Sequence, residues 1–216
     1  GKLKFQDTIM ISRTLLAIET SSDICGVAVV KGNKILGGID EHLPRKHSEI
    51  LPELTKKVLK DVGLKFDEID GIALSIGPGS FTGLRIGLGF SKGIAYAKSI
   101  PLIPIPSLLG MAYVLKKYEP GSGILYSHAK KVFFQEFLWS DGVPDVKRRA
   151  SVGDIEKYMS RLENGFYYNC YSIISHNYNM HEVTPSACSI GLLASIYYEK
   201  WASKDTYEIV PDYIAP

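Results

Sequence analysis

Apolar residues in the first half of the chain form short continuous runs, interrupted by one stretch with helical spacing. Continuous runs of this length are typical of buried strands, and they predict strands at 14–19, 25–31, 34–39 and 72–76. The turn at Gly32-Asn33 joins the second run to the third, which makes the first three strands an antiparallel meander. Apolar residues at helical spacing then predict a helix that Ser48 caps and Gly63 ends. A second helix is expected over 85–98.

The order of these elements predicts the fold class. Three strands, a helix, a strand and a helix make a ribonuclease-H-like lobe, so we expect an α/β fold of two such lobes, as in the sugar-kinase, Hsp70 and actin (ASKHA) superfamily, with the second lobe reduced. The lobes are expected at 13–105 and 106–216, with a C-terminal tail that could pack back on the first. Weaker patterns in the second half predict helices at 107–117, 155–162 and 186–204 and strands at 123–126, 132–139 and 166–175.

Composition narrows the class of protein. The 216 residues are 45% hydrophobic and 22% charged, and the net charge of +2 gives no basic stripe of the kind that a nucleic-acid binder acting alone would show. Cys25, Cys170 and Cys188 lack metal-ligand spacing and no secretory signal is visible, so reduced thiols and a cytoplasmic location are expected. No apolar run reaches the ~20 residues that cross a bilayer, and we expect no membrane partner.

A glycine-rich stretch at 77–85 lies between the fourth strand and the second helix. This layout suits a phosphate, because glycines let the backbone approach an anion and the helix start offers free N–H groups. The predicted phosphate-binding residues are Gly77, Gly79, Ser80, Thr82 and Gly83. The competing interpretation is a tight strand-to-helix connection in which the glycines only permit the turn. No Lys-Ser/Thr pair follows the last glycine, so the stretch is not a P-loop.

Three other groups of residues are weighed as sites. His176 and His181, with Cys170 upstream, have poor spacing for a metal, and we expect no metal site. Glu19 with Asp23 could hold a magnesium nucleotide, although a capped turn explains them better. The tyrosines at 167, 168 and 171 could stack bases, but strand packing accounts for them more simply. No catalytic residue is predicted.

Taken together and in this order, several motifs resemble the TsaB (YeaZ) family over roughly residues 14–213. They are the runs 16–21 (Leu-Ala-Ile-Glu-Thr-Ser), 47–52 (His-Ser-Glu-Ile-Leu-Pro), 77–85, 104–107 (Pro-Ile-Pro-Ser), 183–185 (Val-Thr-Pro) and 210–213 (Val-Pro-Asp-Tyr). The glycine-rich run and the histidine motif also occur in the larger catalytic relative TsaD, whose chains are over a hundred residues longer.

The resemblance implies a catalytically silent subunit that binds and activates a TsaD-like enzyme. With a TsaE-like ATPase, that enzyme transfers a threonylcarbamoyl group to the adenosine beside the anticodon of tRNA. The implied partners are therefore the TsaD-like and TsaE-like proteins, with tRNA bound only through the complex and a homodimer when the chain is alone. No cofactor is implied for the isolated chain, and ADP or ATP is allowed at the surface shared with the partner.

Departures from the TsaD pattern support a non-catalytic chain. The TsaD family binds a metal with an HxxxH motif, and the corresponding positions here are Ser107 and Met111. Ile24 stands where TsaD has an acid. The chain also departs from TsaB, since Ser127–Lys131 replaces an Asp-Ala-Arg motif and the usual Tyr-Leu-Arg ending is missing.

The resemblance also implies that the two helices of the first lobe form the partner interface. The residues expected there are apolar and recur at helical spacing: Ile50, Leu51, Leu54, Val58, Ile86 and Phe90. Small residues at 87, 89, 91, 93 and 95 keep the second helix slim enough for close approach. The alternative is that both helices are simply buried within the chain.

Two other classes of function stay open. One is an active small enzyme of the same fold, either a glycoprotease-type peptidase or a small ATPase, against which the missing HxxxH motif and the short second lobe argue. The other is a homodimeric interaction module without a role in tRNA modification.

Overall fold

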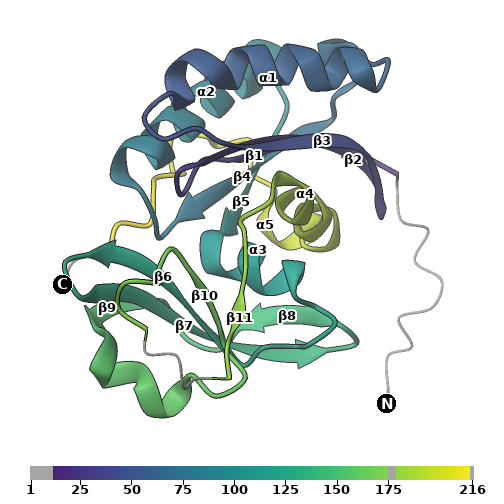
Figure 1. The fold of residues 1–216 in the computed structure, drawn as a ribbon. Coiled ribbons are helices and arrows are strands. Elements are labelled where there is room, and N and C mark those ends of the chain that lie inside the picture. The colour runs from purple at the N-terminus through teal and green to yellow at the C-terminus, as the bar shows by residue number, and fades with distance from the viewer. Residues whose placement is uncertain (1–11, 175–178, 215–216) are drawn as a thin grey trace, which may run out of the picture.

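The structure is a computed structural model that describes residues 12–174 and 179–214. Two β-sheets lie roughly one above the other, with helices above and between them (Figure 1). The elements of the first half are β1 (Thr14–Glu19), β2 (Ile24–Lys31), β3 (Lys34–His42), α1 (His47–Asp61), η1 (Phe66–Glu68), β4 (Gly71–Gly77), α2 (Phe81–Lys98) and β5 (Leu102–Pro106).

The second half contains the whole of the other sheet and the remaining helices. Its elements are α3 (Ser107–Val114), β6 (Ser122–His128), β7 (Lys131–Ser140), β8 (Val143–Val146), β9 (Ser151–Asp154), η2 (Ile155–Arg161), β10 (Phe166–Tyr168), β11 (His181–Glu182), α4 (Ala187–Ile196) and α5 (Tyr198–Trp201).

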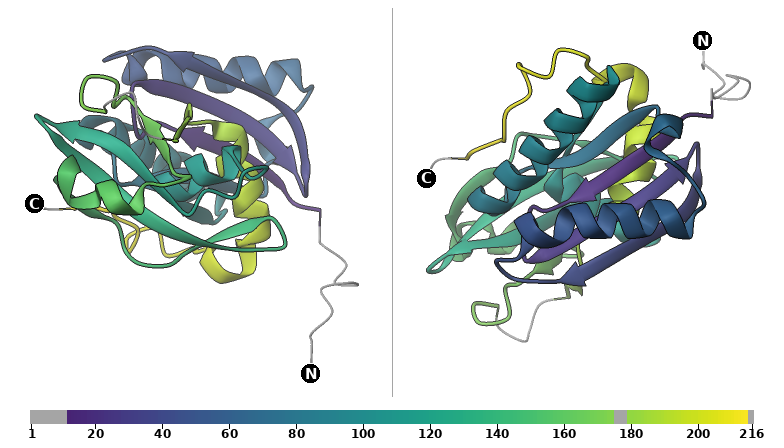
Figure 2. Two further views of the ribbon diagram at one scale, coloured as in Figure 1. Left: turned by 60° about the horizontal axis from the view of Figure 1, so that its bottom comes forward. Right: turned by 90° about the horizontal axis from the view of Figure 1, so that it is seen from above.

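The first sheet has the strand order β3-β2-β1-β4-β5. β1, β2 and β3 are antiparallel neighbours, whereas β4 pairs in parallel with both β1 and β5. β1 is buried along its whole length because helices cover both faces of the sheet. α1 and α2 lie side by side on the outer face (Figure 2, right), and α4 packs on the inner face. Burial on both faces explains why β1, β2 and β4 read as continuous apolar runs, whereas β3 at the edge of the sheet is mostly exposed.

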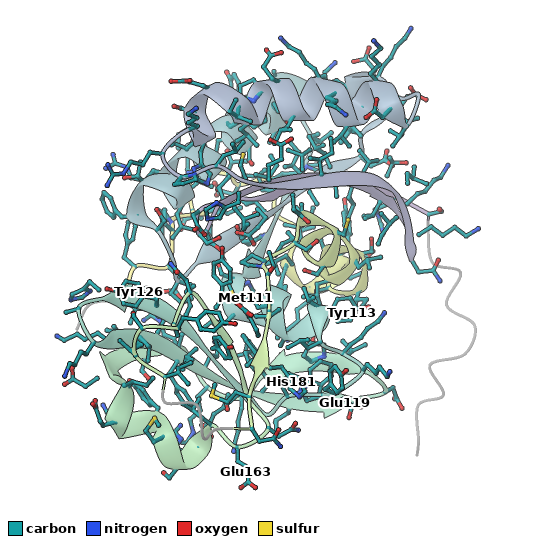
Figure 3. All side chains as sticks on the ribbon, in the orientation of Figure 1. Met111, Tyr113, Glu119, Tyr126, Glu163 and His181 are labelled. Atoms are coloured by element: carbon teal, nitrogen blue, oxygen red, sulfur yellow. The ribbon has the colours of Figure 1, made fainter. Side chains whose placement is uncertain are left out.

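The second sheet has the strand order β11-β10-β6-β7-β8, and β9 pairs with β7. The largest hydrophobic cluster lies between the two sheets, where α3 and α4 contribute most of their side chains. Met111 on α3 lies in this layer (Figure 3) and is 1% exposed. Both sheets and the layered arrangement confirm the predicted α/β class with two lobes.

The end of the chain returns to the first sheet. The N–H of Asp212 donates to the carbonyl of Ile76, 2.8 Å away. Tyr213 packs its ring on Phe81 at the start of α2, with 4.9 Å between the ring centroids. The C-terminal segment therefore bridges the two halves of the chain. Within the described residues, no helix combines the length and apolar character that crossing a bilayer needs.

The structure corrects three predicted boundaries in the first half. α1 begins at His47 after Lys46, and no side chain caps it, so Ser48 is not the cap. α2 begins at Phe81 rather than at 85, because Ser80 caps it by accepting a hydrogen bond from the N–H of Gly83. Half of the glycine-rich stretch is therefore helix. The third strand runs on to His42, beyond the expected end at 39.

Further corrections concern the second half. The helix expected at 107–117 ends at Val114, and the one at 155–162 is a 3-10 helix. The strand expected at 166–175 ends at Tyr168. The long helix expected at 186–204 is broken at Tyr197 into α4 and α5.

Candidate functional site

A cleft of about 850 Å³ opens between the two sheets, at the carboxyl end of β1. The turn after β1, the start of α2 and the loop before α1 line its first-lobe wall. The end of β6 and the segment after β10 line the opposite wall. Figure 3 shows Tyr126 at the cleft end of β6. Ligands of open α/β sheets commonly bind at such an edge, so this cleft is the candidate site.

The glycine-rich turn packs directly on the turn after β1. The N–H of Ser80 donates to the carbonyl of Ser21 at 2.7 Å, and the hydroxyl of Thr20 donates to the carbonyl of Gly83 at 2.9 Å. A Cβ atom on Gly79 would lie 2.1 Å from the Ser21 carbonyl oxygen, and one on Gly83 would lie 2.1 Å from the Thr20 oxygen. These positions admit only glycine because backbone atoms occupy the space that a side chain needs.

Three N–H groups of this turn, those of Gly77, Ser80 and Gly83, donate to acceptors within the chain. Gly77 donates to the hydroxyl of Ser107 at 3.0 Å, and its φ of +118° is one that side chains disfavour. Gly83 donates to Ser80, as described above. The packing interpretation therefore accounts for the glycines at 79 and 83 without an anion. Ser80 and Thr82 are exposed and line the cleft, so the phosphate-binding turn stays a prediction that rests on the start of α2.

Glu19, at the end of β1, is buried beneath the cleft and is 1% exposed. One of its carboxylate oxygens accepts hydrogen bonds from the N–H and the hydroxyl of Ser21, at 2.6 and 2.5 Å, and from the hydroxyl of Ser75 at 3.0 Å. Burial raises the pKa of Glu19 to about 7, although the bonds from Ser21 act in the opposite direction. The carboxyl group is therefore poised to change protonation near neutral pH.

Asp23 is held by different partners and links the two walls of the cleft. Its carboxylate accepts the hydroxyl of Tyr168 at 2.5 Å and contacts the ring nitrogen of His42 at 2.5 Å. Burial, together with Asp23, raises the pKa of Tyr168, so the hydroxyl stays a donor. Glu19 and Asp23 thus have separate hydrogen-bonding roles. This arrangement favours a structural role for both carboxylates over binding of a magnesium nucleotide. It also engages Tyr168, one of the three tyrosines considered for base stacking, in a hydrogen bond within the chain.

Only half of the predicted partner interface lies on the surface. Leu51, Leu54 and Val58 are 0%, 5% and 1% exposed, because they pack α1 onto the first sheet. Their assignment to a partner surface is corrected: the isolated chain already buries them. Ile50 and the two predicted residues of α2 are partly exposed at the edge of the same cluster.

The outward face of α2 has an unusual shape. Ile86, Phe90 and Ile94 form a line of partly exposed apolar side chains along the helix. Gly89 and Gly93 lie beside that line, and among the described residues nothing beyond the neighbouring residues and backbone of α2 comes within 4 Å of a Cβ placed on either. Two exposed aromatic rings lie near the two ends of the helix, with Phe81 56% and Tyr96 80% exposed.

Of the histidine-cysteine group, the structure describes His181 and Cys170, and each has other surroundings than a metal site. His181 stacks on Tyr118 with 4.3 Å between ring centroids, and burial raises the pKa of Cys170 to about 12, which disfavours the thiolate. His176 lies outside the described residues. Within residues 12–174 and 179–214, no three side chains from His, Cys, Asp and Glu gather as they would around an ion. Ser107 and Met111, the two positions compared with HxxxH, are buried in α3.

Two features of the cleft were missed by sequence reasoning. The bond between Tyr168 and Asp23 joins residues 145 positions apart, and no local pattern signals it. Arg45 and Asn169 line the cleft with φ angles of 64° and 56°. The Pro44-Arg45 and Asn169-Cys170 pairs carry only the general signal of turn residues.

Comparison with known proteins places this geometry in a family. The family model described as tRNA N6-adenosine threonylcarbamoyltransferase (TsaD) matches residues 20–131, which is more than half of the chain. The tRNA threonylcarbamoyladenosine biosynthesis protein TsaB of Haemophilus influenzae is 34% identical over 133 residues, which cover 60% of this chain and 56% of that protein. A tRNA N6-adenosine threonylcarbamoyltransferase of Caldicellulosiruptor bescii is 36% identical over 115 residues, 46% of this chain and 34% of that protein. The match thus spans about half the length of the curated TsaB relative.

The fold extends the similarity over nearly the whole chain. YeaZ from Pseudomonas aeruginosa superposes with a TM-score of 0.78 at 20% identity, covering 94% of this chain and all of the other. This confirms the predicted fold class. Since the family model covers most of the first lobe, including the glycine-rich turn, and TsaB proteins are among the similar sequences, the chain belongs to the TsaD-like family and, within it, groups with the TsaB (YeaZ) proteins.

Proposed function

We propose that this chain is a non-catalytic subunit of tRNA threonylcarbamoyladenosine biosynthesis, which binds a TsaD-like enzyme through the outward face of α2 and the adjacent edge of α1. The observation that carries the proposal is that face: a line of partly exposed apolar side chains next to glycines with open space above them. Glycines at a helix surface let a second helix approach closely, and exposed aromatic rings are typical anchors of an interface.

The side chains at the positions compared with TsaD, and the carboxylates near the cleft, support a role without chemistry of its own. Ser107 is fully buried and accepts the N–H of Gly77, and Met111 is packed between the sheets. Neither side chain resembles the histidines that the resemblance to TsaD implies at these positions. Glu19 and Asp23 are engaged in hydrogen bonds within the chain. The proposed contribution is therefore activation of the partner by contact.

Other partners follow from the same proposal. A TsaE-like ATPase would join the pair of subunits, tRNA would bind through the complex in the cytoplasm, and ADP or ATP would bind at the joint surface rather than to the isolated chain. In the absence of the enzyme, the same face of α2 would pair two copies of this chain. The lobes at 13–105 and 106–216 would move as a unit, since Tyr168 and the C-terminal segment tie them together.

The test is co-elution of the chain with its cognate TsaD-like protein in gel filtration with light scattering. We expect the wild type to co-elute and Ile86→Asp and Phe90→Asp to abolish co-elution, since burying a carboxylate in an apolar interface costs ~3 kcal/mol or more. Ile35→Asp is the matched control: Ile35 is 49% exposed on β3, away from α2, and this variant should still bind.

Circular dichroism separates loss of binding from loss of folding. Ile86→Asp and Phe90→Asp should keep the wild-type spectrum, whereas Leu54→Asp should unfold because Leu54 belongs to the core. A folded Ile86→Asp variant that co-elutes like the wild type would show that the enzyme binds elsewhere.

A further inference from the structure

A second hollow, of about 560 Å³, lies between the lobes and shares no lining residue with the cleft. The C-terminal segment runs between the two: Asp212 lines the second hollow, and Ile214 lines the cleft. The apolar residues that line the second hollow include Pro78, Pro104, Pro106 and Trp201. This hollow has no part in the function proposed above.

One buried side chain in this hollow has an unused acceptor. Gln135 on β7 is 4% exposed, and its amide N–H donates to the carbonyl of Arg148 at 3.2 Å. That bond fixes which end of the amide is nitrogen. The carbonyl oxygen, Oε1, is buried and finds no donor among the residues that the structure describes. A buried acceptor without a donor is costly, so a ligand that supplies an N–H would gain from binding here.

Cationic side chains surround the mouth of the hollow. Arg149 reaches Asp212 at 2.5 Å, with its side chain 74% exposed. Lys200 lies 3.8 Å from Asp145 and 5.4 Å from the ring centroid of Trp201. Each cation thus faces one carboxylate, Asp212 or Asp145, but the side chains of Arg149 and Lys200 are 74% and 58% exposed. Exposed ion pairs of this kind are weak, so an anionic group at the mouth can share both cations.

We propose that this hollow binds a small carboxylic acid with an apolar body and an adjacent N–H group, the chemistry of an N-acyl amino acid. The N–H donates to Oε1 of Gln135, the apolar body packs on the prolines and Trp201, and the carboxylate pairs with Arg149 and Lys200. The three features are found together in this one hollow: a buried acceptor, an apolar wall and cations at the mouth.

The direct test is titration of the full chain with N-acetyl-L-leucine, followed by the indole N–H signals in ¹H–¹⁵N NMR spectra. The chain has two tryptophans, and Trp201→Phe assigns their signals. We expect a saturable shift of the Trp201 signal. The Trp139 signal should stay in place, because its indole donates to the carbonyl of Pro120 and it does not line the hollow. No saturable shift of Trp201 at about 10 mM probe would overturn the proposal.

Two variants and one altered probe test the assigned contacts. Gln135→Leu and Arg149→Gln should each weaken binding about tenfold, the usual effect of losing one such hydrogen bond or ion pair. N-acetyl-L-leucinamide, which lacks the carboxylate, should bind the wild type about tenfold more weakly. Arg149→Gln should remove that preference for the acid, whereas Gln135→Leu should retain it.

Arg148→Gln is the matched control, since Arg148 is an exposed neighbour whose side chain does not line the hollow. It should bind the probe like the wild type. If Arg148→Gln and Arg149→Gln weaken probe binding equally, the effect of Arg149 is only general charge attraction, and the proposal is overturned. Should Gln135→Leu fail to fold, Arg149→Gln decides the question, because its side chain is largely exposed and its loss leaves the core intact.

Discussion

At the scale of single residues, Glu19 is the group with the clearest consequence for stability. Its pKa rises from 4.5 to about 7 in the folded chain, so between these values the folded state holds a proton that the unfolded state has released. The stabilisation is complete below about pH 4.5 and is lost as the pH rises through 7. Replacing the carboxyl group by an amide, which cannot ionise, should remove this pH dependence.

Urea unfolding between pH 4.5 and 8 measures the effect. Relative to Glu19→Gln, the free energy of unfolding of the wild type should fall by about 3 kcal/mol as the pH rises across this range. Gln offers a similar acceptor to Ser21 and Ser75, so the two proteins should be similarly stable at the acidic end. Parallel pH profiles for the two proteins would contradict the raised pKa of Glu19.

A pair of glycines in α2 gives a second prediction at this scale. Gly83→Ala should destabilise the chain by about 2–3 kcal/mol, because its Cβ would lie 2.1 Å from the Thr20 oxygen. Gly89→Ala is the same change in the same helix where space is open, and it should stabilise by about 0.5–1 kcal/mol. Thermal unfolding of the two variants measures the difference, and equal effects would refute the packing explanation.

At the scale of elements, the sequence predicts well where one strong signal acts alone. All four apolar runs become strands, and burial on both faces makes the pattern distinct in β1, β2 and β4, whereas β3 at the edge is mostly exposed. Gly32-Asn33 marks the hairpin correctly. The prediction is wrong where local signals compete. The glycines after Ser80 suggested a loop, yet α2 begins at Phe81, because the hydroxyl of Ser80 accepts the N–H of Gly83 and caps the helix. The tyrosines at 167, 168 and 171 suggested one strand, yet β10 ends at Tyr168.

The candidate site was harder to predict than the fold. The sequence identifies the glycine-rich turn, but it cannot show that Thr20 and Ser21 fill the space above the glycines. Helical spacing identifies the apolar positions of α1 and α2, but it does not divide them between core and surface. That division depends on the sheet beneath, which buries Leu54 and leaves Phe90 partly exposed.

At the scale of the whole molecule, the hydroxyl of Tyr168 ties the second sheet to the first through Asp23. Tyr168→Phe removes a partly buried hydrogen bond to a carboxylate and should lower the free energy of unfolding by about 1–2 kcal/mol. It should also increase amide hydrogen exchange in the turn after β1, since that turn loses a contact with the other lobe.

Tyr171→Phe is the matched control for this prediction. Tyr171 also donates to a carboxylate, that of Glu182 at 2.9 Å, but its side chain is 67% exposed. Exposed bonds of this kind contribute little, so this variant should unfold like the wild type. If the two variants lose stability equally, Tyr168 has no special part in holding the lobes together.

The close packing of Gly79 and Gly83 on the neighbouring turn has a consequence for how such chains are classified. A chain that joins these two turns in this way needs glycine at both places, whether or not it turns over a substrate. The motif then diagnoses an architecture, and an enzymatic label transferred on its strength alone has no chemical basis. For proteins built like this one, catalytic competence is better judged from side chains such as those at 107 and 111, where the resemblance to TsaD implies imidazoles and this chain has a hydroxyl and a thioether.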